Sequence, residues 1–235
     1  MHRLKHHEFY IWMIGLILYY GYLGYIIPLH STDWFWGSGH GMQVVSNVFN
    51  NFNGRYISNL LEFASVHSIL LRTLSFAFIS IFIVVLLLRL LNQFGDTNYL
   101  ILSTVLLFII PNSLFAQSYG NFEFFYTYVF GTCFSLYILS FIIKVLLNKD
   151  EFSRIEVFIF WLICTLGQWF AEPLAFYNAS ILLVGMIYYA IRNHKFYYSL
   201  VLGWLLSLCG AMVRLLNDKY IYIFSSVEAL RGHLD

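Results

Sequence analysis

Charged residues are scarce in this chain of 235 residues. Asp, Glu, Lys and Arg make up 11% of it, whereas they account for about 25% of a soluble domain. Hydrophobic residues make up 60%, and they fall in long runs, which indicates that lipid is the solvent for most of the chain. The net charge of +1 provides no basic surface, so we expect no nucleic-acid partner.

Cysteine is also rare. Cys133, Cys164 and Cys209 all fall inside apolar runs, where they behave as small hydrophobic residues, so no disulfide or zinc framework is expected. The sequence lacks a P-loop, a nucleophile elbow and a dinucleotide-binding fingerprint, and its histidines lack the spacing of a zinc-binding helix. The residues at the end of the first apolar run, Tyr25–Pro28, are bulky and contain no cleavage site, so this run is predicted to remain as a membrane span.

The apolar runs predict about seven membrane-spanning helices, because a helix needs about 20 residues to cross a hydrocarbon core of about 30 Å. The predicted spans are Phe9–Ile27, Leu70–Leu91, Tyr99–Ile110, Phe124–Leu147, Ile155–Phe170, Leu174–Ile191 and Phe196–Leu216. The third is short and stops before Pro111. No stretch outside these runs is long enough to bury a core of its own. The expected fold is therefore an all-α polytopic bundle forming one integral membrane domain over residues 1–235.

Lys and Arg residues suggest an orientation for this bundle. If the spans alternate, eight of the 13 basic residues lie on the side of the amino terminus and five lie on the other side. Short cytoplasmic loops carry the excess of basic residues. We therefore expect a cytoplasmic amino terminus, with the protein in a bacterial cytoplasmic membrane and the long first loop outside.

That first loop, Pro28–Ser68, is the longest connection in the chain. Helical spacing of its apolar residues predicts two helices lying at the membrane interface, over residues 41–52 and 55–67. Gly54 lies between them, where a glycine can adopt a positive φ and reverse the chain.

Three acids lie next to span ends on the outer side: Asp33, Glu123 and Glu172. Asp33 is flanked by aromatic residues, so partial desolvation would raise its pKa and suit it to act as a general base or a metal ligand. The alternative is a helix cap or a solvated loop acid. The three acids come from different connections, and together they are candidates to line one outward cavity.

Arg55 lies near the start of the second predicted loop helix. An arginine can hold a phosphate through two parallel hydrogen bonds, and helix amino termini also favour anions. The expected anion at this depth is a lipid phosphate or diphosphate. The alternative for Arg55 is an ion pair with a headgroup or with Glu62. Arg72 and Arg214, near the outer ends of their spans, are each expected to pair with an outer acid.

These features resemble the amino-terminal module of GT-C glycosyltransferases, in which an acid follows the first span and an outer loop carries two interfacial helices. More narrowly, Asp33-Trp34, Phe52-Asn53-Gly54-Arg55-Tyr56 and Gln168-Trp169-Phe170-Ala171-Glu172 resemble uncharacterised bacterial membrane proteins similar to O-antigen glucosyltransferases. Members of such families carry more spans. The chain is then the amino-terminal module of a longer protein, a minimal member, or a scaffold that has lost activity.

The resemblance implies a membrane glycosyltransferase that takes a sugar from a polyprenyl-phosphate carrier in the membrane lipid. It implies that Asp33 is the catalytic acid/base and that Glu123 is the second-loop acid, which in some relatives binds a divalent metal ion. Arg55, Glu172, Trp34 and Tyr56 are the expected substrate-binding residues. The competing interpretation is a protein without enzymatic activity: a transporter, a lipid-carrier flippase or a subunit of a cell-envelope assembly. Repeats or broken helices near the membrane midplane would favour a transporter.

Overall fold

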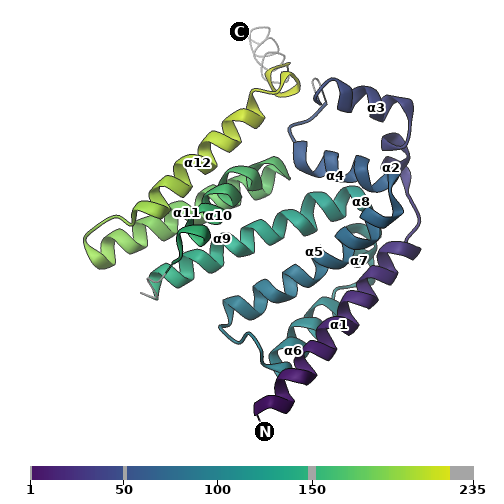
Figure 1. The fold of residues 1–235 in the computed structure, drawn as a ribbon. Coiled ribbons are helices and arrows are strands. Elements are labelled where there is room, and N and C mark those ends of the chain that lie inside the picture. The colour runs from purple at the N-terminus through teal and green to yellow at the C-terminus, as the bar shows by residue number, and fades with distance from the viewer. Residues whose placement is uncertain (1, 50–51, 148–151, 223–235) are drawn as a thin grey trace.

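The computed structural model describes residues 2–49, 52–147 and 152–222, and these parts of the chain form helices joined by short links (Figure 1). The helices that make up the bundle are α1 (His2–Ile26), α5 (Ile69–Leu90), α6 (Thr97–Phe108), α7 (Asn112–Ser118), α8 (Phe122–Phe124), a π-helical segment η1 (Phe125–Phe130), α9 (Gly131–Leu146), α10 (Arg154–Leu166), a 3-10 turn η2 (Gly167–Trp169), α11 (Glu172–Asn193) and α12 (Tyr198–Leu215). No strand occurs among the described residues. The prediction of an all-α bundle is confirmed.

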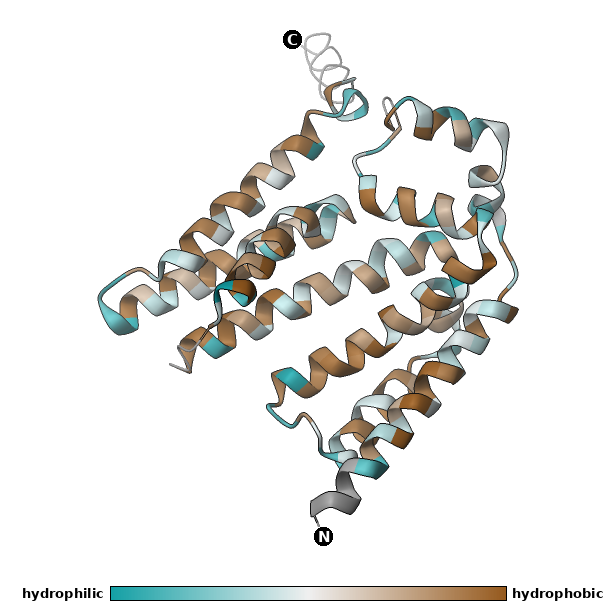
Figure 2. Ribbon diagram, in the orientation of Figure 1, coloured by the Kyte–Doolittle hydropathy of each residue, from teal (hydrophilic) through white to brown (hydrophobic). Residues whose placement is uncertain are grey.

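Five helical segments of the described chain are long and apolar enough to cross a membrane. They are His7–Ile26, Ile69–Leu90, Phe122–Leu146, Glu172–Asn193 and Tyr198–Leu215. Figure 2 shows hydrophobic residues along these helices and hydrophilic ones at links such as that between α11 and α12. Hydropathy alone located all five to within a few residues, because each is one continuous apolar run.

Two of the seven predicted spans correspond to short helices, which are not by themselves long enough to count among the membrane-crossing helices of the described chain. The third predicted span is α6, which has only 12 residues and is bent by 92° against α7, so the pair counts at most as a sixth, broken span. The fifth predicted span is α10, which has 13 residues and a length of about 20 Å at 1.5 Å per residue. Pro111 caps α7, in agreement with the predicted end of the third span. Gly167 ends α10 and divides an apolar run that hydropathy treats as continuous.

The long helices pack side by side in chain order. Helix α1 contacts α5 and α6, α5 contacts α9, α9 contacts α10 and α11, and α10 contacts α12. Buried phenylalanines fill the spaces between them: Phe76 stacks on Phe125 at 4.3 Å, and Phe141 stacks on Phe160 at 3.8 Å between ring centroids. Much of the high aromatic content therefore forms the core rather than a ligand cavity.

The first loop folds into three short helices at one end of the bundle (Figure 1): α2 (Ser31–Trp36), α3 (Gly39–Ser46) and α4 (Tyr56–His67). The sequence predicted α4 and most of α3 but not α2. Helix α3 ends before its predicted limit because Val48 and Phe49 adopt positive φ angles of 54° and 58°. We call this end, where α11 also begins and α12 ends, the α4 end. The opposite end holds the amino terminus and is called the N-terminal end.

Candidate functional site

Arg55 is the centre of a charged cluster at the α4 end. It precedes α4, and its guanidinium contacts acids from two other connections: Nη2 lies 3.2 Å from Glu172 Oε2, and Nη1 lies 3.7 Å from Glu123 Oε1. Glu172 begins α11, and Glu123 lies in α8. The side chains of all three residues are partly exposed. The Nε atom of Arg55 is buried and has no hydrogen-bond partner, so the guanidinium retains an unused donor.

Glu172 extends the cluster to a second arginine. Its Oε1 accepts hydrogen bonds from Arg214 Nη2, at the end of α12, and from the hydroxyl of Tyr220. Arg214 is buried, and its Nη1 also donates to the backbone oxygen of Gln168 at 3.0 Å. The expectation that Arg214 pairs with an outer acid agrees with this geometry. Arg72 instead lies over the ring of Phe122, with its Cζ 5.3 Å from the ring centroid.

Gly54 does not have the structural role that was predicted for it, which was to reverse the chain with a positive φ. Its φ is not positive; among the described glycines only Gly95 has a positive φ. A Cβ at Gly54 would lie 2.3 Å from Arg214 Cγ. The glycine is therefore required for the close approach of the chain to Arg214, which places the residue before α4 beside the end of α12.

Asp33 is fully buried in α2. Its Oδ2 accepts a hydrogen bond of 2.8 Å from the backbone N–H of His30, which is the capping arrangement at the start of α2. The backbone N–H of Glu123 also bonds to the Asp33 carboxylate. Burial raises the pKa of Asp33, and the hydrogen bonds from His30 and Glu62 partly oppose this shift. Oδ2 of Asp33 thus caps α2, whereas Oδ1 is buried and has no hydrogen-bond partner.

Glu62 lies beside Asp33 and was not predicted as a site residue. Its side chain on α4 is only 1% exposed and is in hydrogen-bond contact with the side chains of Asp33 and Trp36. Burial raises the pKa of Glu62 to about 9, and the nearby negative charges of Glu123 and Asp33 contribute to the shift. Glu62 is therefore protonated at neutral pH. Two buried carboxyl oxygens of this pair, Glu62 Oε1 and Asp33 Oδ1, have no hydrogen-bond partner.

Helix α4 presents its polar residues to the protein. Ser58, Asn59, Glu62 and Ser65 are buried, whereas Leu60 is 50% exposed. The apolar positions used to predict this helix thus include one that faces outward. The polar residues of α4 recur with helical spacing, and this pattern was the sequence feature that could have revealed the burial of Glu62. Polar residues at helical spacing in a membrane protein usually face the protein interior.

A cavity of about 310 Å³ adjoins the cluster. It is lined by Thr32, Phe35, Trp36, Phe52, Asn59 and Glu123. Glu123 connects this cavity to Arg55, because the same side chain lines the wall and pairs with the guanidinium. Asp33 does not line the cavity, although its neighbour Thr32 does. A molecule in this space would meet aromatic faces, one amide and one carboxylate.

The two aromatic site candidates lie differently. Trp34 is 63% exposed on α2, and no contact brings it to the charged cluster. Tyr56 begins α4, its hydroxyl accepts a hydrogen bond of 3.1 Å from Asn217, and its ring packs edge-to-face on Trp169. Tyr56 therefore helps to hold the start of α4 against the end of α12.

The described part of the chain contains no group of three or more His, Cys, Asp or Glu side chains arranged to hold a metal ion. The fold and site define a helical bundle of the membrane type with an ion-pair cluster and a carboxyl pair at one end. No protein-family model matches the chain, and comparison with curated proteins and with solved structures likewise found no match.

Proposed function

We propose that the α4 end is the site of a membrane glycosyltransferase-like protein, which transfers a sugar from a polyprenyl-phosphate donor to an extracytoplasmic acceptor. The observation that carries this proposal is the contact of Arg55 with both Glu123 and Glu172 beside the cavity. Four connections far apart in the sequence supply charged groups to one place. Such convergence, together with a carboxyl of raised pKa, is common at functional sites, although structural ion-pair networks also produce it.

In the proposed reaction, the acceptor hydroxyl attacks the anomeric carbon of the sugar. The bond from that carbon to the phosphate oxygen breaks, and the polyprenyl phosphate leaves with the electron pair. Arg55 binds the phosphate through its unused Nε–H and through an Nη now paired with Glu123 at 3.7 Å. Asp33 takes the proton of the hydroxyl. Because Asp33 is buried, the reaction requires α2 to shift so that its carboxylate reaches the cavity.

A binding measurement tests the role of Arg55. We expect the purified chain in nanodiscs to bind a polyprenyl phosphate, and Arg55→Gln to weaken binding at least tenfold, because a charge-assisted bond to phosphate contributes about 1.5–3 kcal/mol. Lys195→Gln is the control, because it removes an exposed positive charge outside the cluster. Equal affinity of the Arg55→Gln variant and the unmodified chain would contradict the assignment.

Three observations favour a protein without enzymatic activity. Asp33 caps a helix, Arg214 is fully paired at its Nη atoms, and α6 and α7 form a sharply bent pair. Bent or broken spans are frequent in transporters. A transporter or a carrier flippase would move a lipid phosphate across the membrane without cleaving it, so donor movement without sugar release distinguishes this alternative.

A further inference from the structure

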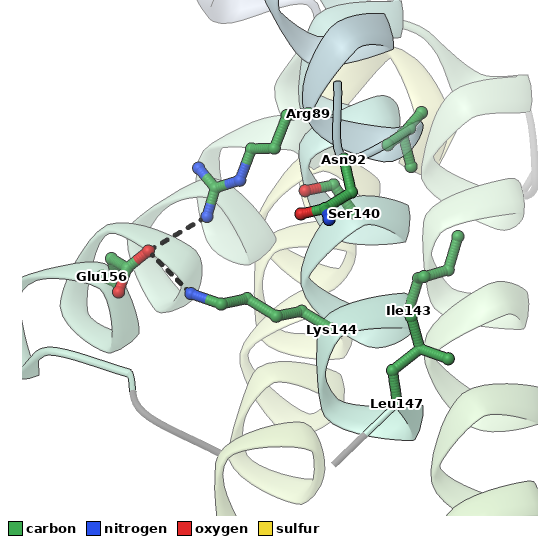
Figure 3. Close-up of a pocket in the computed structure, with 8 residues that line it drawn as sticks. Arg89, Asn92, Ser140, Ile143, Lys144, Leu147 and Glu156 are labelled. Atoms are coloured by element: carbon green, nitrogen blue, oxygen red, sulfur yellow. Dashed lines mark hydrogen bonds and ion pairs between the residues drawn. The ribbon is translucent and has the colours of Figure 1, made fainter. Parts of the chain in front are cut away.

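A second polar site lies at the N-terminal end, away from the α4 cluster. A pocket of about 260 Å³ is formed where α5 and α9 end and α10 begins. Its polar wall contains Arg89, Asn92, Ser140, Lys144 and Glu156. Figure 3 shows the side chains of Arg89 and Lys144 extending from different helices toward the same carboxylate of Glu156.

The pocket has more positive than negative charge. Arg89 Nη2 and Lys144 Nζ lie 3.1 and 3.3 Å from the same oxygen, Glu156 Oε1. The other oxygen, Oε2, accepts a hydrogen bond from the backbone of Ser153 at 3.1 Å. One carboxylate thus faces two cations. All three side chains are about one-third exposed, so an anion can approach from outside the protein.

Aromatic rings hold the two cations in place. The Cζ of Arg89 lies 5.1 Å from the ring centroid of Tyr137, and Lys144 Nζ lies 4.5 Å from that of Phe152. Arg192 is nearby as well, because its Nη1 donates to the backbone oxygen of Leu146 at 3.0 Å. The basic side chains are therefore fixed around the pocket by contacts other than the ion pair with Glu156.

The remaining wall of the pocket is apolar and consists of Leu90, Ile143 and Leu147. Leu147 is an exposed hydrophobic residue at the end of α9. A pocket that is cationic on one side and aliphatic on the other, at the ends of membrane-spanning helices, matches a phospholipid at the junction of its headgroup and acyl chains.

We propose that this pocket binds the phosphate of an anionic phospholipid between Arg89 and Lys144, with the first part of an acyl chain against Ile143 and Leu147. The proposal is independent of sugar transfer at the α4 end. Free phosphate offers the same chemistry to the two cations, but it would leave the aliphatic wall unused.

The test compares three probes on the purified full chain: short-chain phosphatidylglycerol, short-chain phosphatidylcholine and inorganic phosphate. We expect phosphatidylglycerol to bind more tightly than phosphatidylcholine and to raise the unfolding temperature more. Arg89→Gln with Lys144→Gln should remove that preference, and each charge should account for about a fivefold change in affinity. Lys195→Gln, which removes an exposed cation outside the pocket, should keep it.

The Glu156→Gln variant distinguishes a lipid-binding site from an ion-pair group of Arg89, Lys144 and Glu156 that has only a structural role. Glutamine keeps the capping box with Ser153, because either residue type serves at this position, but it removes the internal counter-charge. We expect this variant to bind phosphatidylglycerol about fivefold more tightly. Unchanged or weaker binding in Glu156→Gln would overturn the proposal. So would an equal preference for phosphatidylglycerol in the double variant, or a pocket-dependent effect of inorganic phosphate as large as that of the lipid.

Discussion

Arg55 and Glu172 form an ion pair of 3.2 Å between residues 117 positions apart in the chain. The contact joins the start of α4 to the start of α11, and Glu172 in turn accepts from Arg214 at the end of α12. One carboxylate therefore links the first loop to the last two spans. The charged residues of the α4 end form a connected network rather than separate surface groups.

The first prediction concerns the two acids that Arg55 contacts. Glu172→Gln should destabilise the chain by about 2 kcal/mol, because it leaves the buried charge of Arg214 without compensation. The loss should be smaller than for a fully buried pair because the Glu172 side chain is 35% exposed. Glu123→Gln is the matched control, and it should cost less than about 1 kcal/mol because its ion pair is long and partly exposed. Thermal unfolding in detergent measures both, and equal losses would contradict the network.

The second prediction concerns pH. The pKa of Glu62 in the folded chain is about 9, against an ordinary value of 4.5, so the folded chain holds a proton that the unfolded chain releases between these values. The contribution of protonated Glu62 to the free energy of unfolding is fully present below about pH 4.5, falls as the pH rises, and is lost above about pH 9. The slope in this window approaches about 1.4 kcal/mol per pH unit.

Glu62→Gln should remove this part of the pH dependence, because glutamine does not titrate. Unfolding temperatures from pH 5 to 9 measure the effect. Glu8→Gln is the control, since Glu8 is an exposed acid on α1 and its replacement should leave the slope as it is. A pH profile of Glu62→Gln that overlays the unmodified profile would show that Glu62 is ionised in the folded chain.

The third prediction concerns Gly54. A Cβ there would lie 2.3 Å from Arg214 Cγ, so Gly54→Ala should displace Arg214 and cost about 1–3 kcal/mol, as overpacking usually does. Gly39→Ala is the matched control, because a Cβ at Gly39 meets no atom within 4 Å and alanine favours the helix. Similar unfolding temperatures for the two variants would mean that α4 and α12 do not approach as closely as described.

The sequence was sufficient to predict the helical membrane bundle and the five long spans, because an apolar run of about 20 residues has few alternatives to a crossing helix. It also predicted that the span at α6 is short, because Pro111 interrupts the apolar run there. It did not predict that α10 ends at Leu166, since the apolar run continues past Gly167. Helix α2 was missed as well, because its six residues are too few to show helical periodicity.

The site was predictable only in part. Asp33, Glu123 and Glu172 were recognisable as acids next to span ends, and Arg55 as a basic residue at the start of a loop helix. Their pairing was not, because it depends on how α8 and α11 pack against α4, and Arg55 contacts Glu123 and Glu172 rather than Glu62. The burial of Glu62 beside Asp33 was missed because an acid on a surface helix would normally face water, although the polar stripe of α4 indicates that this face is turned inward.

The rate of sugar transfer by the Asp33→Asn variant is the most direct test of the proposed function. The donor is first bound to the chain in nanodiscs, and a single turnover to an added acceptor is then followed. Asparagine keeps the shape of Asp33 but does not accept a proton. We predict that the variant folds and binds donor like the unmodified chain but transfers the sugar at least about a hundredfold more slowly, the usual contribution of a general base. Transfer by Asp33→Asn at the unmodified rate would contradict the account.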